Sequence, residues 1–243
     1  MKIKQNSALG LMVSKRLRID GITFYKRGNQ LIGRTSSSMA KRTNTLPQFI
    51  QRQKMRHATA LWRQLKYFKP MFTQRGNAYQ NFISLANKLP VVYVTRRNMT
   101  NTTFLIPGIP VSDGILPTIK QELGQIDGTP ALITNLEYAK RHFDERLRLY
   151  TVEQNRNNVI PSVRFSMRDV SWDELAVENG CYALKGEEFA DDMKGWALVL
   201  IKDNDCSPQT IVTRCTFFQK YTTDEALNTA AKSYGGLTRS RFE

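Results

Sequence analysis

Four cationic side chains in one segment have a spacing that suits phosphate binding. Arg56, Arg63 and Lys66 follow Arg52 by 4, 11 and 14 residues, so a helix places all four on one face. Guanidinium and ammonium groups in such a row form charge-assisted hydrogen bonds with phosphates without reading a base sequence. The pattern therefore predicts contact with a polyanion. Other basic residues before this helix extend the predicted contact set: Lys15, Arg16, Arg18, Lys41 and Arg42.

The positive charge of the chain is concentrated in its first third. Up to Lys88 there are 18 Lys and Arg and one acid, Asp20, whereas the remainder has 18 basic and 20 acidic residues. The whole-chain net charge of +15 is therefore a property of the first segment. Ordinary solvated helices mix both signs, so this imbalance favours an anionic partner over simple solvation. The partner can be DNA, RNA or an acidic protein surface.

The residues that most often carry catalysis stand in no recognisable motif. His57 lies among basic neighbours and His142 in a charged segment, and we expect both to be surface or capping residues. No glycine-rich phosphate-binding motif is present. We therefore expect no catalytic residue and no cofactor. An enzyme that uses Cys215 or His142 in an unfamiliar site is the third and weakest alternative.

Metal binding and disulfide formation are also disfavoured. Cys181, Cys206 and Cys215 are odd in number and lack the C-x-x-C spacing, so we expect reduced structural thiols. Asp203 and Asp205 resemble the start of a calcium loop, but the required glycine and distal glutamate are missing. An ordinary hairpin turn is the prediction there, and no metal site is expected.

Two amphipathic helices should carry the basic stretch. The first is predicted over 46–69, with Thr45 as its cap and Pro70 at its end. Its apolar residues recur at steps of three and four, and they include Trp62, for which we expect a role in the core. The second helix is predicted over 77–88.

The rest of the chain has the composition of β-strands separated by turns. A hairpin is predicted over 21–35, and helices are expected to start at the capping sequences near Ser171 and Thr222. The segment 137–158 fits either a solvated helix or a long loop. Six further strands are predicted at 91–95, 103–107, 131–136, 162–167, 196–201 and 210–218.

These elements together predict an α+β fold. It consists of a basic N-terminal arm and hairpin, two amphipathic helices, and an antiparallel β-sandwich or barrel-like domain with a C-terminal helix. The chemistry changes between 1–88 and 89–243, although the helices can still pack on the sheet. No apolar run approaches the roughly 20 residues of a membrane span, and no signal-peptide pattern is present. A cytoplasmic or virion location is therefore expected.

Several stretches resemble a family of uncharacterised basic proteins from Bacteroides-type gut bacteria, their phages and mobile elements. The resemblance is carried by ITFYKRGNQLIGR, QFIQRQKMRHATALWRQLK, LPVVYV, LIPGIPVSDGILPTI, GTPALIT and VTRCTFFQKYTTDEALNTAAKSYGG. It implies a non-enzymatic protein of a virion or mobile element, and it supplies no site residues.

The functional expectation is a structural or assembly protein, such as a phage virion component. Its basic N-terminal region would contact nucleic acid or neighbouring subunits, and we expect an oligomer without a membrane partner. The alternative is a free DNA- or RNA-binding protein without sequence preference.

Overall fold

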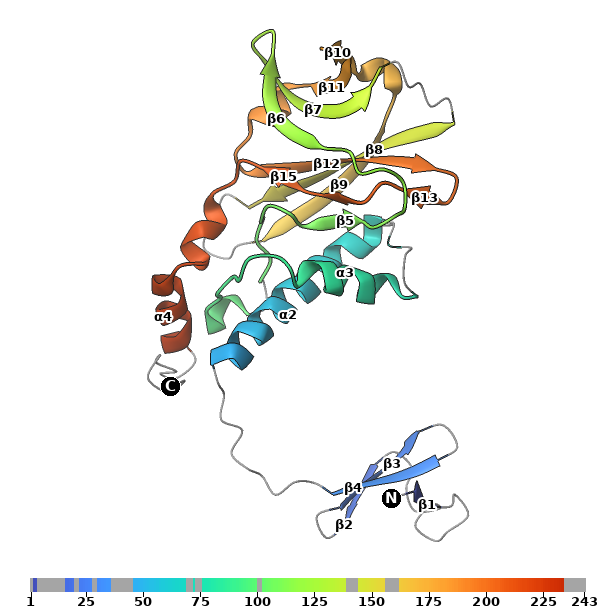
Figure 1. Cartoon of the computed structure of the whole chain (residues 1–243). Helices are drawn as coiled ribbons and strands as arrows, with labels where there is room; N and C mark the ends of the chain where they lie inside the picture. The colour runs from blue at the N-terminus through green and yellow to red at the C-terminus, as the bar shows by residue number, and fades with distance from the viewer. Residues whose placement is uncertain are drawn as a thin grey trace. The chain divides into compact units, whose positions relative to one another are not determined.

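The computed structural model divides the chain into two compact units (Figure 1), residues 1–44 and residues 45–243. Each unit is described by itself. The structure describes residues 2–3, 16–19, 22–27, 30–35, 46–68, 72, 76–99, 102–138, 144–155 and 162–233.

The first unit contains a four-stranded antiparallel sheet in the order β1-β4-β3-β2. Its strands are β1 (Lys2–Ile3), β2 (Arg16–Ile19), β3 (Ile22–Arg27) and β4 (Gln30–Thr35). The predicted hairpin is confirmed, because β3 pairs with β4 across the turn. Phe24 and Leu31 are buried, as the alternation of apolar and polar residues requires. The sequence did not predict β2, which lies in the segment expected to be an arm.

Both predicted amphipathic helices are confirmed in the second unit. They are α2 (Leu46–Leu65), which continues as the 3₁₀ turn η1 (Lys66–Phe68), and α3 (Ala78–Ala86). Asn77 caps α3, because its side-chain oxygen accepts a hydrogen bond from the Tyr79 amide at 2.9 Å. Trp62 of α2 packs against the rings of Phe72 and Phe82. Its predicted role in the core is therefore confirmed.

Two antiparallel sheets form the β-rich part of this unit (Figure 1). We call the four-stranded sheet β10-β11-β7-β6 the outer sheet, and the five-stranded sheet β13-β12-β8-β9, in which β15 also pairs with β12, the central sheet. The outer strands are β6 (Gln121–Ile126), β7 (Thr129–Glu137), β10 (Ala176–Glu178) and β11 (Cys181–Lys185). The central strands are β8 (Glu145–Gln154), β9 (Val163–Val170), β12 (Lys194–Lys202), β13 (Asp205–Cys206) and β15 (Val212–Thr213).

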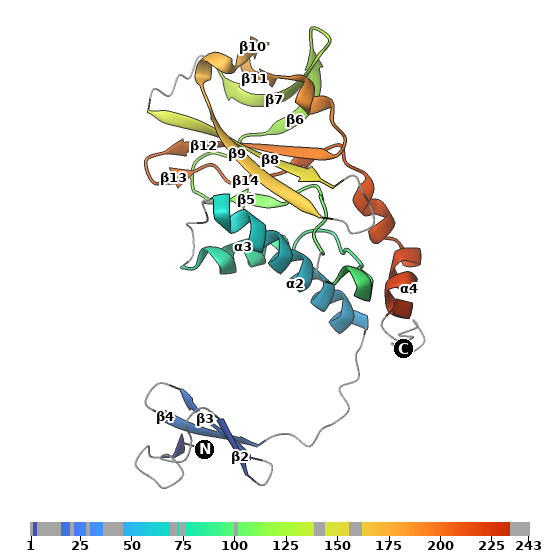
Figure 2. The same cartoon turned by 180° about the vertical axis from the view of Figure 1, so that it is seen from behind.

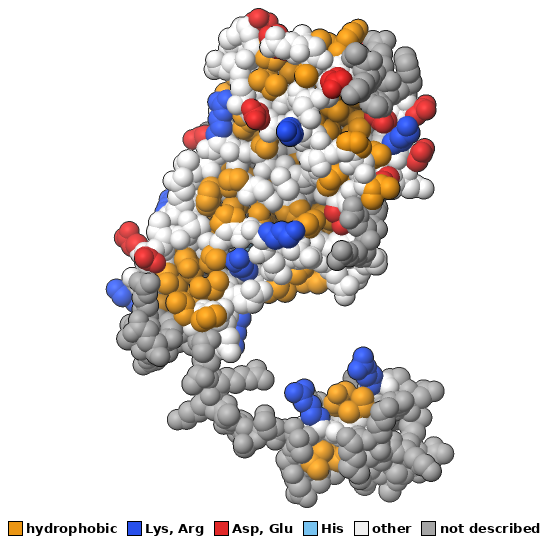
Figure 3. Space-filling model, in the orientation of Figure 1, with side chains coloured by type: hydrophobic (Ala, Val, Ile, Leu, Met, Phe, Trp, Pro, Cys, Tyr) orange, Lys and Arg blue, Asp and Glu red, His pale blue; other side chains and the backbone are white. Residues whose placement is uncertain are grey.

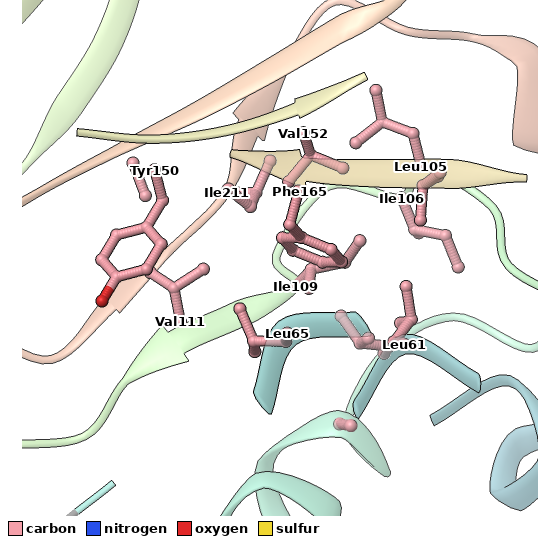
Figure 4. Packing of buried hydrophobic residues seen from close by; sticks show 14 of the residues in the cluster. Leu61, Leu65, Leu105, Ile106, Ile109, Val111, Tyr150, Val152, Phe165 and Ile211 are labelled. Atoms are coloured by element: carbon pink, nitrogen blue, oxygen red, sulfur yellow. The ribbon is translucent and has the colours of Figure 1, made fainter. Parts of the chain in front are cut away.

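The central sheet is buried on both faces at β12. Trp196 and Leu198 of β12 pack with the outer sheet, whereas Ala197 and Val199 pack in a second core with α2 and α3. Successive side chains of a strand point to opposite faces, so covering both faces requires a continuous apolar run such as WALVLI. Figure 4 shows Leu61 and Leu65 of α2 directed toward the residues of this second core.

The second unit is therefore built in layers. Figure 2 shows α2 and α3 on the side of the central sheet that faces away from the outer sheet. A small sheet of β5 (Pro110–Ser112) and β14 (Gln209–Thr210) adjoins these layers. The α+β class and the antiparallel sheets are confirmed, and the described strands form no closed barrel. The two helices belong to the same unit as the sheets, although they fall within the 1–88 segment of the sequence.

Two predicted strands, 91–95 and 103–107, are wrong. Val92, Val94 and residues 104–106 are buried, but neither segment forms a strand. The Tyr93 amide donates to the Tyr221 carbonyl at 2.6 Å, and the Leu105 amide donates to the Gln154 side-chain oxygen at 2.7 Å. The hydrophobicity of this segment therefore reflects burial against the helices rather than sheet pairing.

Three other regions refine or correct the sequence-based prediction. The undecided segment 137–158 contains β8, and 210–218 contains parts of β14 and β15 and the start of η5 (Phe217–Tyr221). Ser171 does form a capping box, but its helix is the single turn η3 (Trp172–Glu174). Asn179 and Gly180 have positive φ and form the turn between β10 and β11.

The predicted C-terminal helix is confirmed as α4 (Asp224–Ser233). The Ala226 amide donates to the Thr223 hydroxyl at its start, and Leu227 and Ala230 pack against Phe49 of α2. Within the ranges given above, no helix is long and apolar enough to cross a membrane.

Candidate nucleic-acid interface

The four cationic residues predicted from their spacing lie together on one side of α2 and η1. We call Arg52, Arg56, Arg63 and Lys66 the basic stripe. Arg56 is half-buried and the other three are exposed. The opposite side of the helix is buried through Gln53, His57, Ala58, Leu61 and Leu65. Phe49 is in line with Arg56 and Arg63 on the stripe side, where Leu227 and Ala230 of α4 cover it. The apolar side of the helix thus fixes the direction in which the stripe faces.

The part of the sequence that contains the stripe has no acidic residue. No Asp or Glu occurs between Asp20 and Asp113, so α2, α3 and the segment up to β5 contain only basic charges. Lys88, Arg96 and Arg97 add exposed cations to this part of the unit. On the face drawn in Figure 3, the acidic side chains of this unit lie over the two sheets and α4. A polyanion on the helical part therefore meets little like-charge repulsion.

Lys54 lies between stripe residues in the sequence, but it has a different function. Its ammonium group donates to the Asn87 carbonyl at the end of α3 at 3.1 Å. A cation at a helix C-terminus satisfies carbonyl groups that have no partner within the helix. Lys54 therefore connects α2 to α3 and holds the stripe in place.

His57 is a buried residue, so its expected surface or capping position is wrong. Its Nδ1 lies 2.8 Å from the Thr102 carbonyl oxygen, and its ring stacks on Phe104 with centroids 5.8 Å apart. Burial lowers the pKa of His57 to about 4, although the hydrogen bond with Thr102 opposes this change. At neutral pH the imidazole is uncharged and adds nothing to the stripe.

An exposed aromatic ring stands at the C-terminal end of the stripe. Tyr67 is 74% exposed, and the Lys66 ammonium lies 4.9 Å from the centre of its ring. Exposed rings beside cations can stack on bases while the cations contact phosphates. Tyr67 is thus a candidate contact residue that was not in the predicted contact set. In the sequence it directly follows Lys66, the last stripe residue, and this position could have indicated it.

The cysteines have the properties of structural thiols. All three are free, and Cys206 and Cys215 are buried. Burial raises the pKa of Cys206 to about 11 and also raises the pKa of Cys215, so both are protonated at neutral pH. Burial at these two positions agrees with the expected structural role, and the reduced state stays a prediction. Among the residues that the structure describes, no group of three or more His, Cys, Asp and Glu side chains could hold a metal ion.

A cleft of about 790 Å³ lies between the end of α3, β5 and the start of β6. Its walls include Leu89 and Ile119, and Ser112, Gln121 and Gln209 provide polar groups. These polar groups bond to one another or to the protein backbone. Gln121 donates to Gln209 at 2.7 Å and to the Leu198 carbonyl at 2.6 Å, and Ser112 accepts from the Gln209 amide at 3.0 Å. These three residues therefore stabilise the junction of the elements, and the charged residues Lys88, Asp113, Lys120 and Glu122 also line the cleft.

The other predicted contact residues cannot be placed on this surface. Arg16 and Arg18 belong to β2 of the first unit, and Lys15, Lys41 and Arg42 lie outside the described residues, as does His142. The chain matches no protein-family model, no curated protein and no solved structure.

Proposed function

We propose that the protein is a non-enzymatic assembly component that binds the backbone of nucleic acid through the basic stripe. Its core positions the stripe, and the basic residues of the first unit extend the contact to nucleic acid or to neighbouring subunits. A phage virion or mobile-element complex is the assembly that the sequence resemblance favours. A freely acting nucleic-acid-binding protein is the alternative.

The supporting observation is a rigid helix with all its stripe cations on the outside. Leu61 and Leu65 anchor α2 in the core, and the exposed side has no acid along α2 and α3. Fixed cations lose less conformational entropy on binding than cations on a disordered arm. Main-chain and base-edge readout are not required, so binding would be largely independent of sequence and strongly dependent on salt.

The test is the salt dependence of DNA binding by the full chain. Each phosphate contact contributes about 0.9 to the slope of log affinity against log salt concentration. Replacing Arg52, Arg56, Arg63 and Lys66 by Gln should therefore lower the slope by about 3 to 4 units. Fluorescence anisotropy with a short DNA duplex of mixed sequence, over about 50 to 200 mM salt, measures both slopes.

A matched control removes the same charge elsewhere. Four exposed cations of the second unit that lie outside the stripe are replaced by Gln: Arg146, Arg164, Arg214 and Lys232. This control should keep most of the slope. Equal slopes for the two variants would show that net charge, and not the stripe, is responsible, and would refute the assignment.

Assembly is tested separately by the size of the protein. Purification without nuclease, followed by sedimentation and electron microscopy, should give defined oligomers or nucleic-acid-bound particles. A monomer that carries nucleic acid would favour the freely acting alternative. A monomer that carries none and binds none would contradict both forms of the proposal.

A further inference from the structure

A cavity of about 290 Å³ lies between the outer and central sheets, near the start of β8. We call it the inter-sheet cavity. It adjoins the cleft beside α3, with which it shares Thr118 and Ile119, and none of the stripe residues lines it. Ten residues line it: Pro117, Thr118, Ile119, Asn135, Leu136, Glu137, Glu145, Trp172, Tyr182 and Leu200. Its volume is close to the lower limit typical of small-ligand sites.

Fixed aromatic rings form part of the wall. Trp172 and Tyr182 lie with ring centroids 5.1 Å apart, and Tyr138 lies 5.6 Å from Tyr182 beside them. The Trp172 indole N–H donates to the Glu145 carbonyl at 2.9 Å, and the Thr134 hydroxyl donates to the Tyr182 carbonyl at 2.6 Å. The first bond holds the Trp172 ring in place before any ligand arrives, and the second holds the backbone of Tyr182, whose ring packs between Trp172 and Tyr138.

The charged side chains among the lining residues are acidic. Glu145 has a side chain only 5% exposed, and Glu137 is exposed at the same cavity. The ten lining residues include no Lys or Arg. The exposed Lys202 lies beside the cavity, with its ammonium 4.0 Å from a Glu145 carboxylate oxygen.

We propose that the inter-sheet cavity binds an organic ammonium group carried on an alkyl chain. The rings of Trp172 and Tyr182 present negative π faces to the cation, and Glu145 supplies the counter-charge in a partly desolvated setting. The apolar walls of Ile119 and Leu200 accept the methylene groups. A lysine side chain or a free alkylamine has this chemistry, and a carboxylate ligand does not.

The position of Lys202 allows a substitution to test the proposal. Its ammonium is on the protein surface beside Glu145, so it competes with the ligand for the same carboxylate. Replacing Lys202 by Met keeps the apolar stem and removes the charge. This change should tighten amine binding, whereas most surface substitutions would leave it unchanged.

The experiment titrates the full chain with matched probes and follows binding by calorimetry and by the indole N–H signal of Trp172. Butylammonium and N-acetyl-lysine methylamide carry the cation, and n-pentanol is the neutral control for butylammonium. The cations should bind at least about tenfold more tightly than the alcohol. A tighter lysine derivative identifies a protein side chain as the source, and a tighter butylammonium identifies a free amine.

Three variants complete the test. Lys202→Met should raise amine affinity about threefold or more, and Glu145→Gln should lower it about tenfold. Lys185→Met, at an exposed lysine that pairs with Asp127 on the outer sheet, is the control and should change nothing. Thermal unfolding confirms that each variant is folded. Equal binding of amine and alcohol, or affinities that do not respond to Lys202→Met, would overturn the proposal. DNA binding by the stripe is independent of either result.

Discussion

At the scale of single residues, burial decides which charges are available. The sequence places Lys54, Arg56 and His57 in one basic cluster, but only Arg56 belongs to the stripe. Lys54 donates to the end of α3, and His57 is enclosed beside Thr102 and Phe104. The sequence could not distinguish these three roles, because the partners lie 33 and 45 residues away.

The buried His57 should make the protein less stable in mild acid. Its pKa is about 4 in the folded state and about 6.5 in an unfolded chain, so only the unfolded chain gains a proton between these values. The free energy of unfolding should therefore fall as the pH falls from about 6.5 to about 4, by up to about 3 kcal/mol from this residue. Stability from this source is fully present above about pH 6.5.

Urea unfolding at several pH values measures this effect. His57→Gln retains a hydrogen-bonding group but cannot titrate, so its stability should depend less on pH in that window. The carboxylates contribute equally to both proteins and cancel in the difference. Parallel pH profiles for the two proteins would contradict the assignment to His57.

At the scale of elements, the sequence predicted the helices in which burial of one face alone produces the spacing of the apolar residues. The stripe and the apolar side of α2 were predicted because burial of one helix face is the only source of the pattern. The strands β7, β9 and β12 were predicted from their β-branched and aromatic residues. β8 was missed because Arg146, Arg148 and Glu153 suggested a solvated helix, although Leu147 and Leu149 alternate with the charges as in a strand.

Irregular segments were the other source of error, and Gln154 explains how one of them is held. This fully buried side chain accepts from the Leu105 amide at 2.7 Å and donates to the Ser162 carbonyl at 2.9 Å. If 103–107 were a strand, the Leu105 amide would bond to the backbone of a neighbouring strand. The Gln154 side chain accepts this hydrogen bond instead. No local sequence pattern reveals such a contact across 49 residues.

Replacing Gln154 by Leu should destabilise the protein strongly. The substitution keeps the volume but leaves the buried Leu105 amide without its partner, at a cost of about 1 to 3 kcal/mol. The Ser162 carbonyl loses one bond and keeps the one from the Asn155 amide. Denaturant unfolding at neutral pH measures the loss. Gln125→Leu, at an exposed position of β6, should cost less than about 0.5 kcal/mol and is the control. Similar losses in the two variants would show that Gln154 is not a structural link.

At the scale of the whole molecule, composition and packing divide the chain at different places. The local net charge changes from strongly positive to nearly neutral near Leu89, whereas the boundary between the compact units lies between Asn44 and Thr45. The helices that carry the stripe share a core with Val199 and Phe165 of the central sheet. The sequence predicted the stripe of the candidate interface, but not the inter-sheet cavity, because residues from separate strands and loops meet only in the folded chain.

A fragment of residues 89–243 should therefore fail as an independent domain. Without α2 and α3, one apolar face of the central sheet is uncovered, including Tyr150, Val152 and Ala197. We expect aggregation or binding of a hydrophobic dye, measured by light scattering and fluorescence. The fragment 45–243 is the control and should remain dispersed. A monodisperse, cooperatively unfolding 89–243 fragment would show that the sheets need no helical cover.

The sharing of one core by α2 and β12 has a mechanical consequence. Because the buried side of α2 packs closely against the sheet, a ligand that restricts the motion of the helix also restricts the motion of the sheet. Engagement of a polyanion should then slow amide hydrogen exchange deep in β12, far from any phosphate. The exchange rate of the β12 amides would therefore report whether a polyanion is bound to the basic stripe.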